Sequence, residues 1–369
     1  MTDGLERGNG AGLSKRQSPT PARLLALHLP QFHPIPENDE WWGKGFTEWT
    51  NVARAKPRYP GHYQPHVPAD LGFYDLRLSE SLDAQADLAR EHGIEGFVFW
   101  HYWFGDGKVL LDQPVQRWIT SGTPAFGFAL AWANQSWTGH WHGGPKRVLI
   151  EQSYPGPDDE VRHFQYLLPA FTDPRYLTVD GRPIFYVFRG ESLPSPERFV
   201  EAWQSMAAKA GLPGLYLVAE MNDPLGRATF RDPWAAGFDA AVDLRLPAER
   251  GRRAMLTMRA LRKVGLPEIY PYASKPLQRA PFDPARPIHP SLVPNWDNTP
   301  RAGRNGLVLH GATPSLFRRH VSAAFDFVQS APIDRRLVFV KSWNEWAEGN
   351  HLEPDFRHGK GFLDALAQS

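Results

Sequence analysis

The sequence predicts a single (β/α)8 TIM barrel, on three observations. Eight short apolar runs recur along the chain, helical patterns separate them, and no linker-like break interrupts the alternation after residue 22. Alternating strands and helices build a parallel sheet covered by helices. We therefore expect one folded domain over residues 23–369, preceded by a disordered tail over residues 1–22. An open doubly wound sheet is the alternative.

The apolar runs are the predicted strands. Continuous apolar runs, rather than alternating ones, are typical of parallel strands that are covered on both faces. In chain order they are residues 23–30, 94–101, 124–132, 182–189, 214–220, 238–244, 289–295 and 336–343.

Helical patterns lie between these runs, with capping residues at their ends. The clearest are residues 78–93, with Ser79 and Gly93 as caps, residues 157–171, residues 195–211, with Ser195 as N-cap, and residues 313–329.

The loops that follow the strands are where a barrel of this type carries its functional groups. The segment after the first run, residues 31–77, is rich in Pro, Gly, Trp and His. Loops of this length inside a compact domain are usually functional. Shorter polar and aromatic segments follow the second, third, seventh and eighth runs. We therefore expect the polar and aromatic residues to gather on one face of the barrel.

The segment after the eighth run reads KSWNEWAEGNHLEPD, residues 341–355. The spacing of Glu345 and Glu348 puts both carboxyl groups on one side of a turn. Two carboxylates are the working groups of most glycoside-cleaving enzymes. Neighbouring Trp rings desolvate a carboxyl and favour the protonated form that a general acid needs. The ordinary alternative is that one Glu caps a helix and the other is solvated.

Other groups could compete for a role at this face. Glu48, Glu220 and Asp297 also lie at or just past the ends of predicted strands and could orient a hydroxyl instead of transferring a proton. His140 and His142 have the spacing that puts two imidazoles on one strand face. No further Asp or Cys stands at ligand spacing, so we predict no metal site. Hydrogen bonds to sugar hydroxyls explain these His residues equally well.

Composition excludes several classes of function. The formal net charge is +1, from 41 basic and 40 acidic residues, so binding to nucleic acid or to an anionic membrane is not predicted. The chain has no cysteine, which excludes thiolate metal sites and Cys nucleophiles. The first 22 residues lack an apolar segment behind a basic start. We therefore expect neither a secretory signal nor a membrane anchor, and a cytoplasmic location.

Motifs of other enzyme classes are missing. The sequence has no G-x-S-x-G, G-x-x-x-x-G-K-[ST] or H-E-x-x-H motif, and no D-x-D of the kind that holds a metal for nucleotide-sugar donors. Many of its 14 Trp residues stand beside polar residues in expected loops. A flat apolar ring beside hydrogen-bonding groups suits a sugar, although Trp is also common in ordinary cores.

Several long motifs together resemble a known family. They are LALHLPQFHPIPENDEWWGKGFTEWTNV, YPGHYQP, FVFWHYWF, NWDNTPR and SWNEWAEGNHLEPD. They resemble the WbsX-like family, often described as glycosyltransferases of polysaccharide biosynthesis. That family is similar in turn to the family 99 glycoside hydrolases, which are endo-acting α-mannosidases. The resemblance runs from about residue 23 to about residue 365. It implies a (β/α)8 barrel without metal or cofactor.

The resemblance also implies roles for the two carboxyl groups. In family 99 hydrolases the first Glu of E-x-x-E acts as a base on the sugar's own 2-hydroxyl, which attacks the anomeric carbon and gives an epoxide-like intermediate. The second Glu protonates the leaving oxygen. Carried over by position, Glu345 is the base and Glu348 is the acid. The bond then breaks with retention, and the substrate supplies the nucleophile.

Further residues in these motifs and loops are expected to bind the substrate. They are His28, Gln31, Glu48, Trp49, His101, Trp103, Trp132, Asn134, Trp137, Asn295, Trp296, Asp297 and Asn344. Five of their Trp rings, at positions 49, 103, 132, 137 and 296, are expected to line one cleft and to stack on sugars.

One position departs from the family pattern. The family usually reads WANENW after the third strand, whereas this chain reads WANQSW, with Gln135 and Ser136. Gln can donate and accept hydrogen bonds but cannot bear charge. The sugar recognised there is therefore expected to differ.

The sequence thus predicts a carbohydrate-active enzyme that acts on α-linked, mannoside-like glycans by the retaining mechanism above. Its expected partner is an oligosaccharide or polysaccharide. One alternative is a glycosyltransferase of cell-surface polysaccharide biosynthesis, making O-antigen or lipopolysaccharide. Another is a glycan-binding barrel without activity.

Overall fold

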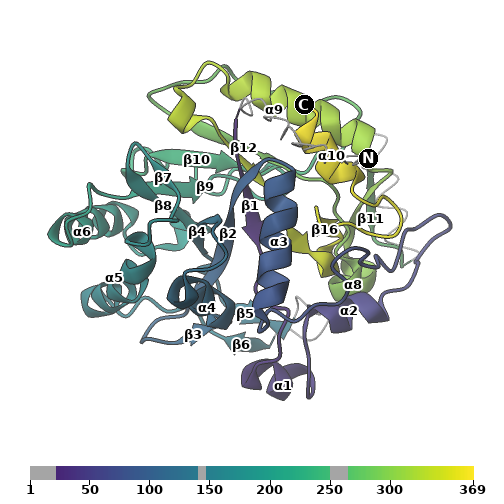
Figure 1. Ribbon diagram of the computed structural model, residues 1–369, viewed down its shortest axis with the longest axis horizontal. Helices are drawn as coiled ribbons and strands as arrows, with labels where there is room; N and C mark the ends of the chain where they lie inside the picture. The colour runs from purple at the N-terminus through teal and green to yellow at the C-terminus, as the bar shows by residue number, and fades with distance from the viewer. Residues whose placement is uncertain (1–21, 140–146, 250–264) are drawn as a thin grey trace, which may run out of the picture.

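Eight parallel strands form a closed barrel in the computed structural model, which describes residues 22–139, 147–249 and 265–369. The circle closes because β1 pairs with both β14 and β2, so the open-sheet alternative is wrong (Figure 1). All eight predicted strands are confirmed. They are β1 (Arg23–His28), β2 (Ile94–Trp103), β4 (Gly127–Trp132), β8 (Arg182–Val187), β9 (Tyr216–Glu220), β10 (Ala240–Asp243), β12 (Ile288–Leu292) and β14 (Leu337–Val340).

The closure joins segments far apart in the sequence. Leu24 of β1 lies beside Val338 of β14 on one side and Ile94 of β2 on the other. At the start of β1, Arg23 donates to Glu95 at 2.7 Å and to Asp334 at 2.6 Å. The guanidinium therefore links β1 to β2 and to the segment that precedes β14, at the amino-terminal end of the barrel.

Helices surround the barrel, with α5 and α6 on one side and α9 and α10 on another (Figure 1). The described helices are α1 (Pro36–Trp42), α2 (Glu48–Arg54), α3 (Ser79–Glu91), α4 (Gln113–Ser121), α5 (Pro157–Phe171), α6 (Pro196–Lys209), α8 (Thr299–Ala302), α9 (Pro314–Val328) and α10 (Gly361–Ala367). None of these helices combines the length and the apolar content that a membrane crossing requires.

The predicted helices are present, with two corrections. Ser195 caps α6 as expected, because its side chain accepts from the amide of Arg198. Ser79 is instead the first residue of α3, and Leu78 stands at the cap. The strand and helix alternation also fails between β9 and β10, where residues 221–239 form turns. The polar, Gly-containing and Pro-containing composition of that segment favours turns over helix.

Several short strands lie outside the eight strands of the barrel. They are β3 (Val109–Leu110) and β7 (Thr178–Val179), which extend the sheet, and the pairs β5 (Trp137–Thr138) with β6 (Val148–Ile150), β11 (Glu268–Pro271) with β13 (Leu307–His310), and β15 (Asn344–Glu345) with β16 (Asn350–His351). The last pair follows β14 and carries the predicted carboxyl groups.

Some predictions fall on residues outside the described part of the chain. They are the disordered tail, except for Ala22, which is buried, and the histidines His140 and His142.

Candidate active site

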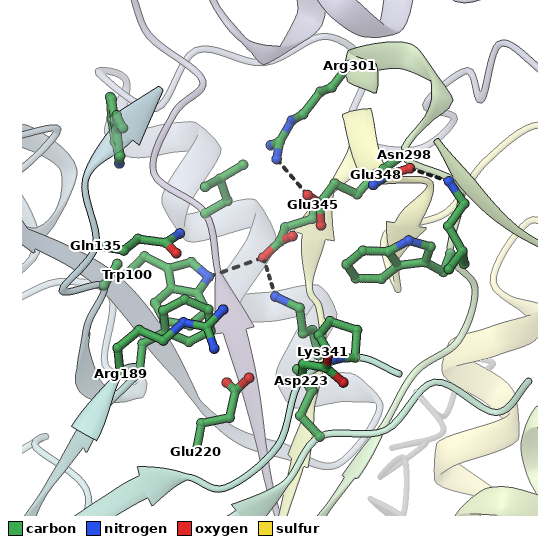
Figure 2. A pocket seen from close by; sticks show the side chains of 18 of the residues that line it. Trp100, Gln135, Arg189, Glu220, Asp223, Asn298, Arg301, Lys341, Glu345 and Glu348 are labelled. Carbon is green, nitrogen blue, oxygen red and sulfur yellow. Dashed lines mark hydrogen bonds and ion pairs between the residues drawn. The ribbon is translucent and has the colours of Figure 1, made fainter. Parts of the chain in front are cut away.

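A cleft of about 380 Å³ opens at the carboxyl ends of the barrel strands. Segments that follow most of the barrel strands contribute to its wall (Figure 2). Its polar and aromatic lining residues include Gln31, Glu48, Trp100, Tyr102, Gln135, Trp137, Arg189, Glu220, Asp223, Trp296, Arg301, Lys341, Glu345 and Glu348. The face on which polar and aromatic loop residues were expected to gather therefore contains this cleft.

The two predicted catalytic carboxyl groups stand on one tight turn. Glu345 ends β15, and a 3-10 turn over Trp346–Glu348 leads to β16, which pairs back on β15. Gly349 closes the turn at φ +56°, and a Cβ there would lie 2.9 Å from the Cβ of Asp297. The left-handed conformation and this close approach both require glycine. The turn therefore presents Glu345 and Glu348 to the same cleft.

Buried polar groups hold the turn from below. Asn344 accepts from the Leu29 amide at 2.7 Å and donates to the Leu29 carbonyl at 3.0 Å, which ties the turn to the end of β1. Glu353 accepts from Tyr74 at 2.9 Å and from Trp346 at 2.5 Å. Burial raises the pKa of Glu353 to about 7. Because both of its oxygens are occupied and it does not line the cleft, Glu353 positions the turn.

Glu345 lies among cationic and hydrogen-bonding groups. Its Oε1 is 3.2 Å from the Nζ of Lys341 and accepts from the indole Nε1 of Trp100 at 3.2 Å (Figure 2). Burial alone would raise the pKa of Glu345, but Lys341, a hydrogen bond from Glu348 and the charge of Arg301 outweigh it and lower the pKa. Glu345 is therefore ionised and can accept a proton.

Glu348 has the opposite character. Burial and the negative charge of Glu345 raise its pKa, although Arg301 donates to its Oε1 at 2.8 Å. The protonated carboxyl of Glu348 donates to Glu345. Neighbouring carboxyl groups with opposed pKa shifts are the arrangement in which one group is an acid and the other a base at the same pH.

Arg301 connects this pair to the long loop after β1. Its guanidinium contacts Glu48 at 2.9 Å and Glu348 at 2.8 Å; both carboxyl groups are buried, and the Arg301 side chain is 13% exposed. Burial raises the pKa of Glu48, whereas Arg301 lowers it. The guanidinium thus joins the loops that follow β1, β12 and β14.

Comparison with known proteins assigns the family. The family described as Glycosyltransferase WbsX matches residues 24–366 of the chain. The uncharacterized protein WxcX of Xanthomonas campestris pv. campestris (strain B100) is 37% identical over 354 residues, which cover 95% of this chain and 50% of that protein. The chain belongs to the WbsX glycosyltransferase family. The resemblance found in the sequence motifs is thereby confirmed, and the chain spans about half the length of the curated relatives it matches.

Solved structures share the fold of this WbsX family member. A glycoside hydrolase-like protein superposes with a TM-score of 0.58 at 15% identity, covering 94% of this chain and 93% of that one. A GH99 endo-alpha-mannosidase from Bacteroides thetaiotaomicron superposes with a TM-score of 0.54 at 13% identity, covering 94% and 96%. These likenesses confirm the barrel.

Several residues predicted to bind substrate line the cleft of the WbsX chain. They are Gln31, Glu48, Trp137 and Trp296, together with Glu345 and Glu348. Gln135, which departs from the family pattern, also lines the cleft, whereas the hydroxyl of Ser136 accepts from the Gln152 amide.

Three residues predicted to bind substrate face away from the cleft. His101 is hydrogen-bonded to His163 of α5 at 2.9 Å, and Trp103 stacks on the same His163 ring. Trp132 packs against His163 and Phe199. These side chains fill the space between the barrel and its helices, so we correct their assignment from sugar contacts to packing.

The remaining predicted binding residues hold loops in place and do not line the cleft. Each has protein partners: His28 with Gln85, Trp49 with Tyr74, Asn134 with Arg189, Asn295 with Trp296, Asp297 with His62 and Gln64, and Asn344 with Leu29. Only two of the five predicted Trp platforms, Trp137 and Trp296, therefore contact the cleft.

Five cleft residues were not predicted from the sequence: Trp100, Tyr102, Arg189, Arg301 and Lys341. Both Lys341 and Arg301 stand inside quoted segments, each four positions from a carboxyl group singled out there, Glu345 and Asp297 respectively. Their positions in the sequence, close to these carboxyl groups, are the signal that could have identified them.

Each of the two cations stands at a short spacing from a carboxyl group in the sequence. Lys341 directly follows β14 and stands four positions before Glu345, so one turn brings its ammonium to that carboxyl. Arg301 ends the NWDNTPR motif, four positions after Asp297. Trp100 and Tyr102 belong to the predicted second strand or its end, and only the direction of their side chains distinguishes them from His101.

A group of buried side chains near the turn has metal-ligand chemistry. Within the described residues, His66, His351 and Asp355 come close enough together to hold an ion. Their polar atoms are already used: His66 and His351 are hydrogen-bonded at 2.9 Å, and Asp355 accepts from the amides of Arg357 and His358. None of the three lines the cleft.

We therefore expect activity on a glycan to survive exhaustive treatment with EDTA, because the cleft contacts of Glu345 and Glu348 are made by protein side chains. The measurement compares initial rates before and after chelation, with a dialysed sample as control. A loss of activity that a divalent ion restores would contradict the prediction.

Proposed function

We propose that this chain acts on an α-glycosidic bond, with Glu345 as the base and Glu348 as the general acid. One observation carries the proposal: two neighbouring buried carboxyl groups share one cleft, and their surroundings shift their pKa values in opposite directions. General acid and base catalysis needs such a pair within reach of one substrate bond.

The proposed reaction begins at the sugar's 2-hydroxyl. Glu345 accepts the hydroxyl proton, and the oxygen attacks the anomeric carbon as the glycosidic bond breaks. Glu348 donates its proton to the leaving oxygen, which takes the bonding electrons. An incoming hydroxyl then opens the strained ring: Glu348 accepts its proton, and Glu345 returns a proton to the 2-oxygen. Both carboxyl groups finish in their starting states, and the configuration is retained.

Transfer and hydrolysis differ only in the incoming hydroxyl. Water gives hydrolysis, and a sugar hydroxyl gives transfer to an acceptor. The family description supports transfer, whereas the endo-alpha-mannosidase that shares the fold supports cleavage of an α-mannoside. We propose an α-linked, mannoside-like glycan as the substrate in either case.

A panel of α-linked oligosaccharides and nucleotide sugars tests the proposal. The protein is incubated with each compound, and the products are identified by mass. Shortened glycans indicate hydrolysis, and extended glycans indicate transfer. No product with any compound, at a protein concentration that would reveal slow turnover, would contradict an enzymatic function and leave a glycan-binding barrel.

The pH dependence of the rate should depend on Lys341. Glu345 must be ionised, so the acid limb follows its lowered pKa; Glu348 must be protonated, so the alkaline limb follows its raised pKa. Lys341 lowers the pKa of both carboxyl groups. Replacing Lys341 with Met should therefore move both limbs to higher pH, which a profile of kcat/KM measures.

Lys360 provides the control for this variant, because it is partly exposed and pairs with Asp70 away from the cleft. Lys360→Met should leave both limbs in place. An acid limb that does not move in Lys341→Met would show that Glu345 is not the ionising group.

A further inference from the structure

Glu220 contributes a further carboxyl group to the cleft. Glu220 is the last residue of β9, it is 1% exposed, and it lines the cleft with Lys341 and Glu345. Figure 2 shows its carboxyl pointing from the strand toward the space between Arg189 and Lys341. The reaction proposed above gives this carboxyl no role.

The two oxygens of Glu220 are in different situations. Oε2 accepts from the hydroxyl of Tyr186 at 2.7 Å, whereas Oε1 is fully buried and has no hydrogen-bond partner among the described residues. Most buried polar atoms in folded proteins are hydrogen-bonded, because an unpaired one has lost its water without gaining another partner. An unpaired oxygen on the wall of a cleft therefore indicates a partner that arrives with the ligand.

Glu48, which also lines the cleft, likewise has a buried Oε1 without a hydrogen-bond partner among the described residues, but its Oε2 forms an ion pair with Arg301. Arg301 and Asn51 hold Glu48, and Lys341, Trp100 and Arg301 surround the catalytic pair. Among the described cleft residues, Glu220 is therefore the buried carboxyl group that combines an unpaired oxygen with the lack of an ion pair.

The charges nearby restrict the chemistry of that ligand atom. Burial raises the pKa of Glu220 to about 7, although Lys341 and Arg189 lower it. An ammonium group of a ligand would meet the positive charges of Lys341 and Arg189, and a carboxylate would meet Glu220 itself. A neutral hydroxyl meets neither repulsion, and it can donate to the ionised form of Glu220 or accept from the protonated form.

We propose that Oε1 of Glu220 binds one hydroxyl of the sugar ring on which Glu345 acts, and that this contact selects the sugar. The two carboxyl groups serve one ring because Lys341 lies between them, in contact with Glu345 and attracted to Glu220. The inference deepens the proposed function and rests on it for the presence of a glycan in the cleft.

Binding to a catalytically weakened variant tests this inference apart from turnover. In Glu348→Gln, the affinities of methyl α-mannoside, methyl α-glucoside, methyl α-galactoside and their monodeoxy analogues are measured by calorimetry. We expect one deoxy analogue of a binding sugar to bind about ten- to a hundredfold more weakly than its parent, as for a hydrogen bond to a charged group. When Glu220→Ala is added, that difference should disappear while the other deoxy penalties remain.

Two further variants keep the result interpretable. Asp159→Ala removes a buried carboxyl of α5 that does not line the cleft and has no part in the proposed reaction, so the full deoxy penalty should remain. If Glu220→Ala lowers the melting temperature too far for binding studies, Glu220→Gln keeps the shape of the side chain, and the penalty should fall below about tenfold because the charge is lost.

The outcomes separate this inference from the proposed function. Deoxy penalties that all persist without Glu220, or no binding by any of the three sugars, would overturn the inference. Glu220-dependent binding in a protein that turns over no glycan would support the hydroxyl site and contradict the proposed catalysis. If the protein turns over a glycan and Glu220→Ala leaves the rate unchanged, the result would support the proposed catalysis and overturn the proposed hydroxyl contact of Glu220.

Discussion

Replacing Glu348 with Gln is expected to lower turnover of a natural glycan by about 10²–10⁴-fold, the usual contribution of a general acid. The amide keeps the shape of the side chain and removes the proton that the leaving oxygen needs. A substrate with a good leaving group, such as a nitrophenyl glycoside, should release that group in the first turnover nearly as fast as with the unchanged protein, because its departure needs little protonation and Glu348 acts as a base only in the later step. First-turnover rates on both substrates measure the effect.

Glu353→Gln is the matched control for this variant. It changes another buried Glu of the same segment, whose pKa burial also raises, but whose oxygens contact Tyr74, Trp346 and Gln85 outside the cleft. Any loss of rate in Glu353→Gln should be equal for the two substrates. Near-normal turnover of the natural glycan by Glu348→Gln would refute the assignment of the acid.

Replacing Glu345 with Gln should impair both kinds of substrate, again by about 10²–10⁴-fold. A better leaving group cannot compensate, because the 2-hydroxyl stays unactivated whatever group departs. With unchanged protein, substrates that carry hydrogen or fluorine in place of the 2-hydroxyl should fail for the same reason, since they lack the internal nucleophile. Rates on the two leaving groups and on the 2-modified substrates measure the effect.

The 2-modified substrates also identify a different mechanism. Accumulation of a covalent glycosyl adduct on Glu345 with a 2-fluoro substrate would show that the carboxylate itself attacks the anomeric carbon. Such an adduct, detected by the mass of the intact protein, would overturn participation of the 2-hydroxyl.

The barrel could be predicted from sequence because its strands are buried on both faces. Runs such as LVFV of β14 are apolar throughout, and helical patterns separate them. The segment between β9 and β10 could not be assigned as reliably, because the rule of alternation suggested a helix there and local composition favoured turns. Closure itself depends on pairing between β1 and β14, which no local pattern reveals.

The site was predicted less completely, and β2 shows why. Successive side chains of a strand point to opposite faces. Trp100 and Tyr102 face the cleft, whereas His101 and Trp103 face α5. Both faces of this strand carry large aromatic residues, so the sequence offers no polar and apolar alternation that would distinguish them. An error of one position therefore replaced cleft residues with packing residues.

The pairing of β1 with β14 also bears on the order in which the molecule folds. Arg23 and Asp334, which meet beside that pairing, are 311 positions apart in the sequence. Contacts between such distant segments form slowly, because a long loop must close before they stabilise the chain. Until that closure, Asn344 cannot reach Leu29, and the turn that carries Glu345 and Glu348 lacks its anchor. Activity should therefore return during refolding only with the last, slowest step, after most of the secondary structure has formed.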